Sequence, residues 1–387
     1  MRSHSPHVPS MAGAGARRSF GILSTLPPTP CGIATFSAAL AAGLVANGDR
    51  VDLARCGPEP ETKPPGGSPG GQASAIDVLN GTDVAIIQHE YGIYDGADGD
   101  EVLELMGGVE VPSIVVAHTV VREPTAGQRF VLERVCDGAD AVVVMTASAH
   151  HRLLESFDVD ASKVLVIPHG ATTPADPSSP ESGESSGRRP PSLLTWGLLG
   201  PGKGIEWALD ALSSLHDLEP RPTYLVAGAT HPKVLADSGE SYRQMLVDRA
   251  RRSGLAPFVT FDDVYRNLAS LTEVIRSADL VVLPYDSEDQ VTSGVLVDAI
   301  AAGRPVVSTA FPHAVELLST GAGLVVPQRD PAALADAIRS VLTDPALAAS
   351  MAAEARRLAP DLSWSAVAGQ YGKLAGQLLG ARHPVRV

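Results

Sequence analysis

The stretch that decides the fold of this chain is Gln290-Val-Thr-Ser-Gly-Val-Leu-Val-Asp298-Ala-Ile-Ala-Ala-Gly303-Arg-Pro-Val-Val-Ser-Thr309. It follows an apolar run, residues 280–284, which is typical of a buried strand. Thr292 and Ser293 are good helix N-caps, and the apolar, alanine-rich residues 295–302 predict a buried helix. A strand is predicted again from residue 306, so the unit is strand, polar loop, helix, strand.

A helix that begins just after the carboxyl end of a strand presents unpaired N–H groups and its positive dipole end to the adjacent crevice. This is a natural site for an anionic ligand such as a diphosphate, and Gly294 lets such a group approach the backbone closely. An ordinary crossover helix that binds no ligand is the alternative interpretation of this stretch.

Composition limits the kind of protein that the chain encodes. Its 387 residues are enough for two domains, and 44% hydrophobic with 19% charged residues is typical of a globular protein. The formal net charge of −14 argues against general nucleic-acid binding, because that binding depends on neutralising phosphates. Three cysteines at no metal-like spacing indicate a reducing compartment, and no apolar run is long enough for a transmembrane helix. We therefore expect a cytoplasmic protein, with residues 1–18 as a disordered tail.

The first half of the chain alternates strands with helices in the manner of a doubly wound sheet. A strand at residues 19–24, a loop carrying Gly32 and a helix at residues 35–46 begin the pattern, although the dinucleotide motif G-x-G-x-x-G is absent. Later strands end in polar side chains, where the sites of α/β proteins lie. These strands are predicted at residues 51–54, 83–87 (followed by Gln88, His89 and Glu90), 114–117 (followed by His118), 141–146 and 164–168 (followed by His169).

The second half repeats this alternation. Residues 172–191 are rich in Pro, Ser and Gly, so we place a linker there between domains at residues 19–171 and 192–363. Two successive domains of this kind leave a cleft between them. Strands are predicted at residues 193–197, 223–228 and 258–261, and helices at residues 204–215, 239–253, 268–277, 331–342, 345–357 and 364–379.

One motif suggests a nucleotide-hydrolysing enzyme but does not fit it. Gly197-Leu-Leu-Gly-Pro-Gly202-Lys203-Gly204 nearly satisfies the P-loop pattern, yet Gly204 occupies the position of the Ser or Thr that would hold Mg²⁺. We therefore reject a P-loop. The flexible amides, the helix start and Lys203 still form a suitable cradle for a diphosphate without a metal ion.

Several runs carry a resemblance to a known family. Taken in order, they are similar to the motifs of retaining, glycogen-synthase-like glycosyltransferases of group 1 (glycosyltransferase family 4-like). That resemblance implies the α/β GT-B fold, in which two Rossmann-like βα-repeat domains face a central cleft. The family-wide runs are Pro28-Thr-Pro-Cys-Gly32-Ile-Ala, Ile167-Pro-His-Gly170, Lys203-Gly204 and Ala302-Gly-Arg-Pro-Val-Val307, and a narrower bacterial branch adds Gln88-His-Glu-Tyr-Gly92, Gly228-Ala-Thr-His-Pro232, Gln290-Val-Thr-Ser-Gly294 and His313-Ala-Val-Glu-Leu-Leu318.

The chain departs from the family pattern at two charged positions. The family carries two glutamates eight residues apart, and Gln290 and Asp298 stand in their places here. Leu198 occupies the position of a family arginine that binds the diphosphate, and Arg304 lies too far along its helix to replace it. The narrower branch resembles this chain in these departures, so we interpret them as variation within an active site.

The resemblance assigns roles to residues on both sides of the cleft. The second domain would bind a nucleotide diphosphate-sugar, linked to GDP or UDP, without a cofactor and without a metal ion. The implied catalytic residues are His118 (near the C6 hydroxyl of the donor sugar), Lys203, Gln290 and Asp298 (on the ribose). The implied donor-binding residues are Gly32, Gly200, Gly202, Gly204, Thr292, Ser293, Gly294 and Tyr265.

The first domain would bring the acceptor, and His89, Glu90 and His169 are its candidate contacts. The resemblance further implies that the last helix, residues 364–380, returns to the first domain. We therefore expect transfer of a hexose, mannose or glucose, to a saccharide, lipid or small-molecule acceptor, with peripheral membrane contact left open. The alternatives are a nucleotide-sugar epimerase, a phosphorylase (for which no pyridoxal-phosphate lysine motif is visible), and a non-catalytic sugar-nucleotide binder or assembly protein.

Overall fold

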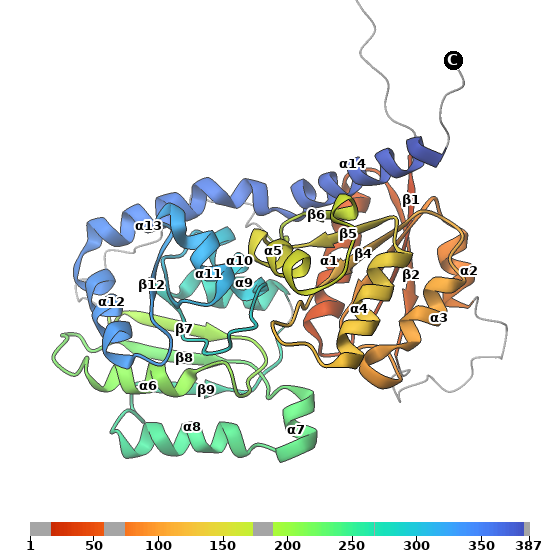
Figure 1. The fold of residues 1–387 in the computed structure, drawn as a ribbon. Coiled ribbons are helices and arrows are strands. Elements are labelled where there is room, and N and C mark those ends of the chain that lie inside the picture. Colours follow the sequence, from red (N-terminus) through yellow and green to blue (C-terminus); the bar gives the residue numbers. More distant parts are fainter. Residues whose placement is uncertain (1–16, 58–73, 173–188, 267, 383–387) are drawn as a thin grey trace, which may run out of the picture.

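The computed structural model describes residues 17–57, 74–172, 189–266 and 268–382. It contains two parallel six-stranded sheets, each covered by helices, which lie side by side (Figure 1). The predicted fold class, two Rossmann-like domains with α/β architecture, is thereby confirmed. The predicted tail and linker fall almost wholly outside the described residues. Arg18, the last residue of that predicted tail, is bound to Asp49 and to the carbonyl oxygen of Gly372.

The first sheet has the strand order β2-β1-β3-β4-β5-β6, and every neighbouring pair is parallel. Its central strands are apolar on both faces because helices cover both, and every residue of β3 and β4 is buried. The carboxyl ends of all six strands consequently meet at one edge. The strands are β1 (Ser19–Ser24), β2 (Arg50–Arg55), β3 (Val84–His89), β4 (Ser113–Ala117), β5 (Ala141–Val144) and β6 (Val164–Val166).

Two layers of helices enclose this sheet. Side chains alternate along a strand, so Ile86 packs in the layer of α1 and α14 while Ile87 packs in the layer of α3 and α4. The threonines Thr125 and Thr146 cap α4 and α5 through their hydroxyl oxygens. The helices are α1 (Gly32–Ala46), α2 (Ala75–Asn80), α3 (Glu101–Gly107), α4 (Ala126–Gly138) and α5 (Ala147–Ser156).

The second sheet has the strand order β12-β11-β10-β7-β8-β9, again fully parallel. The opening stretch of the sequence forms β10, α10 and β11 at the middle of this sheet. The strands are β7 (Ser192–Trp196), β8 (Thr223–Ala227), β9 (Val259–Asp262), β10 (Leu280–Leu283), β11 (Val306–Thr309) and β12 (Gly323–Val326).

The helices of the second domain end in α14, which leaves that domain and packs on α1 of the first (Figure 1). Val367 and Tyr371 of α14 share a core with Phe36 and Leu40 of α1. None of the described helices combines the length and the apolar character needed to cross a membrane. The helices are α6 (Ile205–Ser213), α7 (Pro232–Ser238), α8 (Ser241–Arg252), α9 (Leu268–Ser277), α10 (Gly294–Ala301), α11 (Pro312–Leu317), α12 (Pro331–Thr343), α13 (Pro345–Leu358) and α14 (Trp364–Arg382).

The structure corrects two predicted helix boundaries that position the site. Helix α1 begins at Gly32, three residues before its predicted start, because Cys31 is extended and serves as its N-cap. Residues 239–253 are not one helix: α7 begins at Pro232 and ends at Gly239, whose φ of 61° breaks the helix before α8. Helices α2 to α5, helix α11 and strand β12 were not predicted.

Candidate functional site

The carboxyl edges of the two sheets face each other, as direct contacts between the domains establish. The hydroxyls of Thr35 in α1 and Tyr265 after β9 lie 3.3 Å apart. Thr146 after β5 donates a hydrogen bond of 2.9 Å to the carbonyl oxygen of Val291 after β10. The polar loops that follow the strands therefore enclose the space between the domains, where the predicted site residues lie.

The N-terminus of α10 offers two unpaired amides to this space. Ser293 caps the helix by accepting from the N–H of Leu296 at 3.3 Å, and its own N–H donates to Nδ1 of His313 at 2.9 Å. No described group accepts from the N–H groups of Gly294 or Val295. Two free amides at the positive end of a helix dipole form an anion site.

The loop that carries Lys203 lies beside this helix end. A Cβ on Gly197 would contact Val295 of α10 at 3.5 Å, and the N–H of Asp286 after β10 donates to the carbonyl oxygen of Gly202. Gly204 adopts a left-handed φ of 60°, and a Cβ there would collide with the carbonyl oxygen of Pro284. Glycine is therefore required at position 204 by the fold itself.

Lys203 itself has no carboxylate partner among the described residues. Its Nζ lies 4.3 Å from the ring centroid of Tyr285, a buried tyrosine at the end of β10. A cation over an aromatic face is stabilised less than one in an ion pair, so it remains able to bind an anion. Gly200, in the same loop, packs against Val234 of α7, where a Cβ would approach Cγ2 at 3.0 Å.

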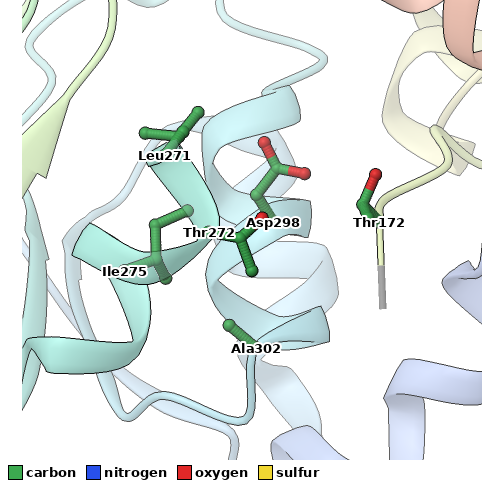
Figure 2. Close-up of a pocket in the computed structure, with 6 residues that line it drawn as sticks. All are labelled: Thr172, Leu271, Thr272, Ile275, Asp298 and Ala302. Atoms are coloured by element: carbon green, nitrogen blue, oxygen red, sulfur yellow. The ribbon is translucent and has the colours of Figure 1, made fainter. Parts of the chain in front are cut away.

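Asp298 lies one turn along α10 in a small pocket between α9 and α10 (Figure 2). Burial raises its pKa to about 7, and no described group donates a hydrogen bond to the carboxylate. A half-buried carboxylate without a hydrogen-bond donor can accept from the hydroxyl groups of a ligand. The other residues that line this pocket are Thr172, Leu271, Thr272, Ile275 and Ala302.

Gln290 and Thr292 lie in the loop that leads into α10. The side-chain amide of Gln290 turns back and donates to the carbonyl oxygen of Thr292. The hydroxyl oxygen of Thr292 is buried and has no hydrogen-bond partner among the described groups. Both polar groups therefore lie beside the free amides of α10 without contributing a charge.

His118 follows β4 and is neutral in this structure. Its Nε2 lies 2.6 Å from Oε1 of Gln88, and its ring meets the edge of Phe36 at a centroid distance of 4.8 Å. Burial, together with the nearby His169 and His89, lowers its pKa to about 3. Gln88 was not predicted as a site residue, although the run Gln88-His-Glu-Tyr-Gly92 marks the end of its strand.

His169 joins the first domain to the N-terminus of α10. Its Nδ1 lies 2.6 Å from the carbonyl oxygen of Gly170, which can only accept, so Nδ1 carries the hydrogen. Burial lowers the pKa of His169 to about 4, so Nε2 is a bare acceptor. A Cβ on Gly294 would lie 2.8 Å from this Nε2, so glycine at that position admits the ring.

His89 and Glu90 occupy different surroundings, although they are adjacent in sequence. His89 is 1% exposed, packs against the ring of Tyr91 and lies on the face of β3 opposite to Gln88. The structure does not bring it into contact with the ring of His118. Glu90 accepts a hydrogen bond from the hydroxyl of Thr119, and burial raises the pKa of its carboxyl group. Lys233 of α7 reaches across to this point and contacts Gly92.

The remaining predicted donor contacts border the same space. Gly32 is the first residue of α1, and no described atom lies within 4 Å of a Cβ added to it. Its N-cap, Cys31, makes no side-chain hydrogen bond to the helix. Tyr265 is 47% exposed and forms the contact with Thr35. Gly32 therefore leaves room that the protein itself does not use.

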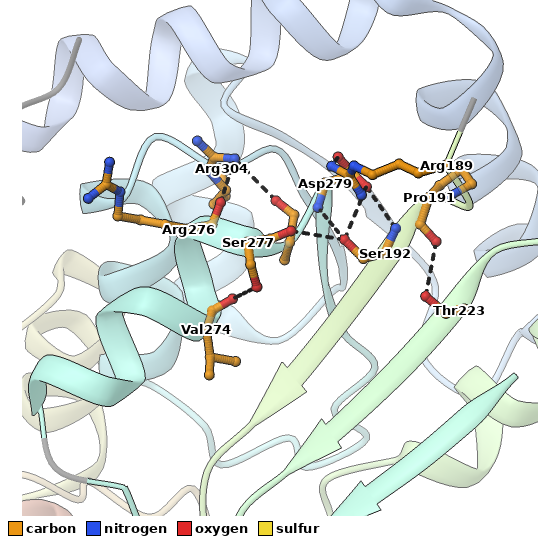
Figure 3. Close-up of polar contacts among 10 residues, drawn as sticks. Arg189, Pro191, Ser192, Thr223, Val274, Arg276, Ser277, Asp279 and Arg304 are labelled. Atoms are coloured by element: carbon orange, nitrogen blue, oxygen red, sulfur yellow. Dashed lines mark hydrogen bonds and ion pairs between the residues drawn. The ribbon is translucent and has the colours of Figure 1, made fainter. Parts of the chain in front are cut away.

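Arg304 lies at the opposite edge of the second sheet and cannot bind a ligand in this space. Its guanidinium donates to the carbonyl oxygen of Arg276, near the amino ends of β7 and β10 (Figure 3). It also donates to the carbonyl oxygens of Ala278 and Ala302. Burial lowers its pKa. The family arginine replaced by Leu198 is thus not compensated by Arg304, and Lys203 and Lys233 are two second-domain cations that lie near the cleft. Among the described residues, no three side chains form a cluster that could hold a metal ion.

Comparison with known proteins identifies related sequences. Residues 190–344 match the sequence family described as glycosyl transferases group 1. The chain is 31% identical over 235 residues to glycogen synthase of Mycobacterium tuberculosis, covering 59% of this chain and 52% of that protein. It is 28% identical over 285 residues to D-inositol 3-phosphate glycosyltransferase of Corynebacterium glutamicum, covering 68% of this chain and 66% of that protein. The chain thus spans about half the length of the glycogen synthase that it matches.

Solved structures support the same fold. Sucrose-phosphate synthase of Thermosynechococcus elongatus superposes with a TM-score of 0.72 at 21% identity, covering 94% of this chain and 100% of that protein. The HepE protein of Anabaena in complex with UDP-glucose superposes with a TM-score of 0.69 at 16% identity, covering 93% of this chain and 100% of that protein. At 21% and 16% sequence identity, the similarity to these two structures establishes the fold alone.

Proposed function

Residues 190–344 are a group 1 glycosyltransferase domain within a GT-B fold, and from this premise we propose that the chain is a retaining glycosyltransferase. It transfers a hexose, mannose or glucose, from a GDP- or UDP-linked donor to a saccharide, lipid or small-molecule acceptor. It needs no metal ion, and it acts in the cytoplasm. HepE, of the same fold, was solved with UDP-glucose, which supports a nucleotide-sugar donor.

The observation that carries this proposal is the pairing of a free cation with free amides. Lys203 has no carboxylate partner among the described residues, and the N–H groups of Gly294 and Val295 have no acceptor there. The loop of Lys203 packs against α10 through Gly197 and Val295. These donors therefore converge on one space, where they would stabilise the negative charge that grows on a leaving diphosphate.

Asp298 supplies the complementary contact. Its carboxylate lies on the same helix as the free amides, in a pocket, without a hydrogen-bond donor among the described residues. A ribose offers two adjacent hydroxyls, which satisfy both oxygens of one carboxylate. A nucleoside diphosphate would thus place its sugar at Asp298 and its phosphates at the N-terminus of α10.

In the proposed reaction the acceptor hydroxyl attacks the donor sugar on the face that the diphosphate leaves. The bond between C1 and the phosphate oxygen breaks, a bond between C1 and the acceptor oxygen forms, and the acceptor proton passes to the leaving phosphate oxygen. Neutral His118 would hold a hydroxyl of the donor sugar, with Gln88 fixing its ring through the 2.6 Å contact. Docking of the two domains excludes water from this step.

A non-catalytic nucleotide-sugar binder is the alternative, and Gln290 is the observation in its favour. This side chain bonds to the carbonyl oxygen of Thr292 and brings no charge to the donor sugar. If the chain binds a nucleotide-sugar but transfers its sugar to no acceptor, it is a binder and not a transferase.

The test begins with a thermal-shift series using GDP, UDP, ADP and the matching monophosphates, with and without Mg²⁺. We expect one diphosphate to raise the melting temperature by several degrees more than its monophosphate, in the absence of metal. The matching nucleotide-sugars are then offered with candidate acceptors, and acceptor-dependent release of nucleotide diphosphate is measured. Stabilisation without release under any acceptor favours the non-catalytic binder, and no stabilisation at all contradicts both functions.

A further inference from the structure

Helix α5 of the first domain contacts the second domain on both sides of the donor helix α10. The hydroxyl of Thr146, its N-cap, donates to the carbonyl oxygen of Val291 at 2.9 Å. The N–H groups of Ala147 and Ser148, in its first turn, donate to the carboxylate of Glu316 at 2.8 and 2.9 Å. Glu316 therefore caps a helix of the other domain, where the helix dipole favours a negative charge.

Arg152, further along α5, completes this contact. Its guanidinium donates to the carbonyl oxygen of Glu288 at 3.1 Å and lies 3.4 Å from a carboxylate oxygen of Asp289. The side chain is only 14% exposed, and burial lowers its pKa. A third bond, to the carbonyl oxygen of Val120, ties it to the first domain. Arg152 therefore reaches from one domain to the backbone of the other.

Both contacts lead directly to the N-terminus of α10. The segment 288–292, which Arg152 and Thr146 hold, ends at the N-cap Ser293 and contains Gln290. Glu316 lies on α11, and His313 on the same helix accepts the hydrogen bond from the N–H of Ser293. Two separate paths thus connect α5 to the residue that begins the donor helix.

We propose that α5 positions the donor-sugar segment, residues 288–292, only when the two domains are docked, with Arg152 and Glu316 as the positioning residues. This inference rests on the proposed transferase function. The contact combines hydrogen bonds and an ion pair with the side chain of Val291, which is buried in the core of the first domain. Opening would release the segment that carries Gln290 while leaving the diphosphate contacts of the second domain in place.

Two of the side chains proposed to bind the nucleotide lie away from α5: Lys203 lies against Tyr285, and Asp298 lies in the pocket between α9 and α10. The amides at the start of α10 are held within the second domain by the cap of Ser293 on Leu296 and by its bond to His313. Loss of the α5 contact should therefore lower transfer without lowering the affinity for a nucleotide diphosphate. A residue that merely stabilised the fold would lower both together.

The experiment compares Arg152→Gln and Glu316→Gln with the control Arg134→Gln. Arg134 forms an exposed ion pair with Asp137 within the first domain, so its substitution removes a charge without touching the second domain. Three quantities are measured for each full-length protein: the dissociation constant for UDP or GDP, the turnover of the matching nucleotide-sugar, and the radius of gyration from small-angle X-ray scattering without ligand.

We expect each α5-contact variant to keep its dissociation constant within about threefold of wild type while turnover falls at least about tenfold. The control should match wild type in both. Unchanged turnover in both variants overturns the proposal, and so does a loss of affinity proportional to the loss of turnover. If wild type neither binds a nucleotide nor turns over a donor, the proposed function has failed. The scattering data then test the docking role of the α5 contact separately. A larger radius of gyration in the variants then supports the docking role, and an unchanged one contradicts it.

Discussion

Gly32 and Gly204 both open a helix after the first strand of their domain, but the fold requires only one of them. Gly204 has a left-handed φ of 60°, and a side chain there would collide with the backbone of Pro284. Gly32 has an ordinary φ and no described atom within 4 Å of its missing side chain. Gly204 is thus explained by the contacts of the protein itself, whereas no described contact explains Gly32.

This difference extends to the two sides of the cleft. The second domain offers groups that lack partners among the described residues: the amides of Gly294 and Val295, the ammonium of Lys203 and the carboxylate of Asp298. In the first domain His118 is paired with Gln88, whereas both ring nitrogens of the buried His89 lack a partner among the described groups. The two sides therefore differ in charge: the unpartnered groups of the second domain include a cation and a carboxylate, and burial lowers the pKa of His89 and His118 in the first.

The largest effect is expected for Gly204→Ala. The left-handed backbone and the collision with Pro284 should together lower the free energy of unfolding by about 3 kcal/mol or more. Gly254→Ala is the matched control, because Gly254 has a φ of 66° but no described atom within 4 Å of a Cβ, so only backbone strain of about 1 kcal/mol remains. Chemical denaturation measures both. Equal losses would show that the contact with Pro284 is unimportant.

The next effect concerns Lys203→Gln. Removing the ammonium should weaken nucleoside diphosphate binding by about 2 kcal/mol, roughly thirtyfold, while a nucleoside monophosphate loses much less. Lys163→Gln is the control, since Lys163 bonds to the carbonyl oxygen of Asp137 on the first domain. Isothermal titration calorimetry gives both affinities. An equal loss for the two nucleotides would mean that Lys203 does not contact the second phosphate.

Gly32→Ala tests whether the open space beside Gly32 is needed for activity. A methyl group there meets no described atom, so the free energy of unfolding should change by less than about 0.5 kcal/mol. Turnover should fall at least about tenfold, because the methyl group enters space needed by the ligands. Gly107→Ala, at the last residue of α3, also meets no described atom and should leave turnover unchanged. Full activity of Gly32→Ala would make Gly32 an ordinary turn residue.

All strands of the two sheets except β12 could be predicted, because buried parallel strands are continuous apolar runs, whereas β12 is only partly buried. Residues 280–284 predicted β10, and the N-cap Ser293 followed from its side-chain oxygen. The short helices α7 and α11 could not be predicted in this way, since each has too few residues to show a helical period.

In the candidate site, too, only features encoded by neighbouring residues could be predicted. The motif around Lys203 is local, so the sequence could identify its cation and its glycines. Glu316 contacts residues 168 and 169 positions away, and no local pattern encodes such a pairing. The role of Gln88 beside His118 likewise depends on the register between β3 and β4, which only the folded sheet defines.

The smallest effect is a pH dependence that comes from Asp298. Its pKa of about 7 lies above the usual value of 3.8, so the folded state favours the protonated carboxyl group. The corresponding stability is fully present below about pH 4 and is lost as the pH rises through about 7. Asp298→Asn should therefore be more stable than wild type at pH 8, and the gain should vanish in acid.

Nucleotide binding should show the opposite trend, because only the ionised carboxylate accepts hydrogen bonds from both ribose hydroxyls. For a single group with a pKa of about 7, the ionised fraction rises up to about tenfold between pH 6 and pH 8, and affinity should follow it. Asp298→Asn should bind weakly at both pH values. Titrations of GDP or UDP across this range, with a 2′-deoxynucleotide for comparison, measure the trend. An affinity independent of pH in wild type would place the ribose away from Asp298 and leave its pocket without a ligand.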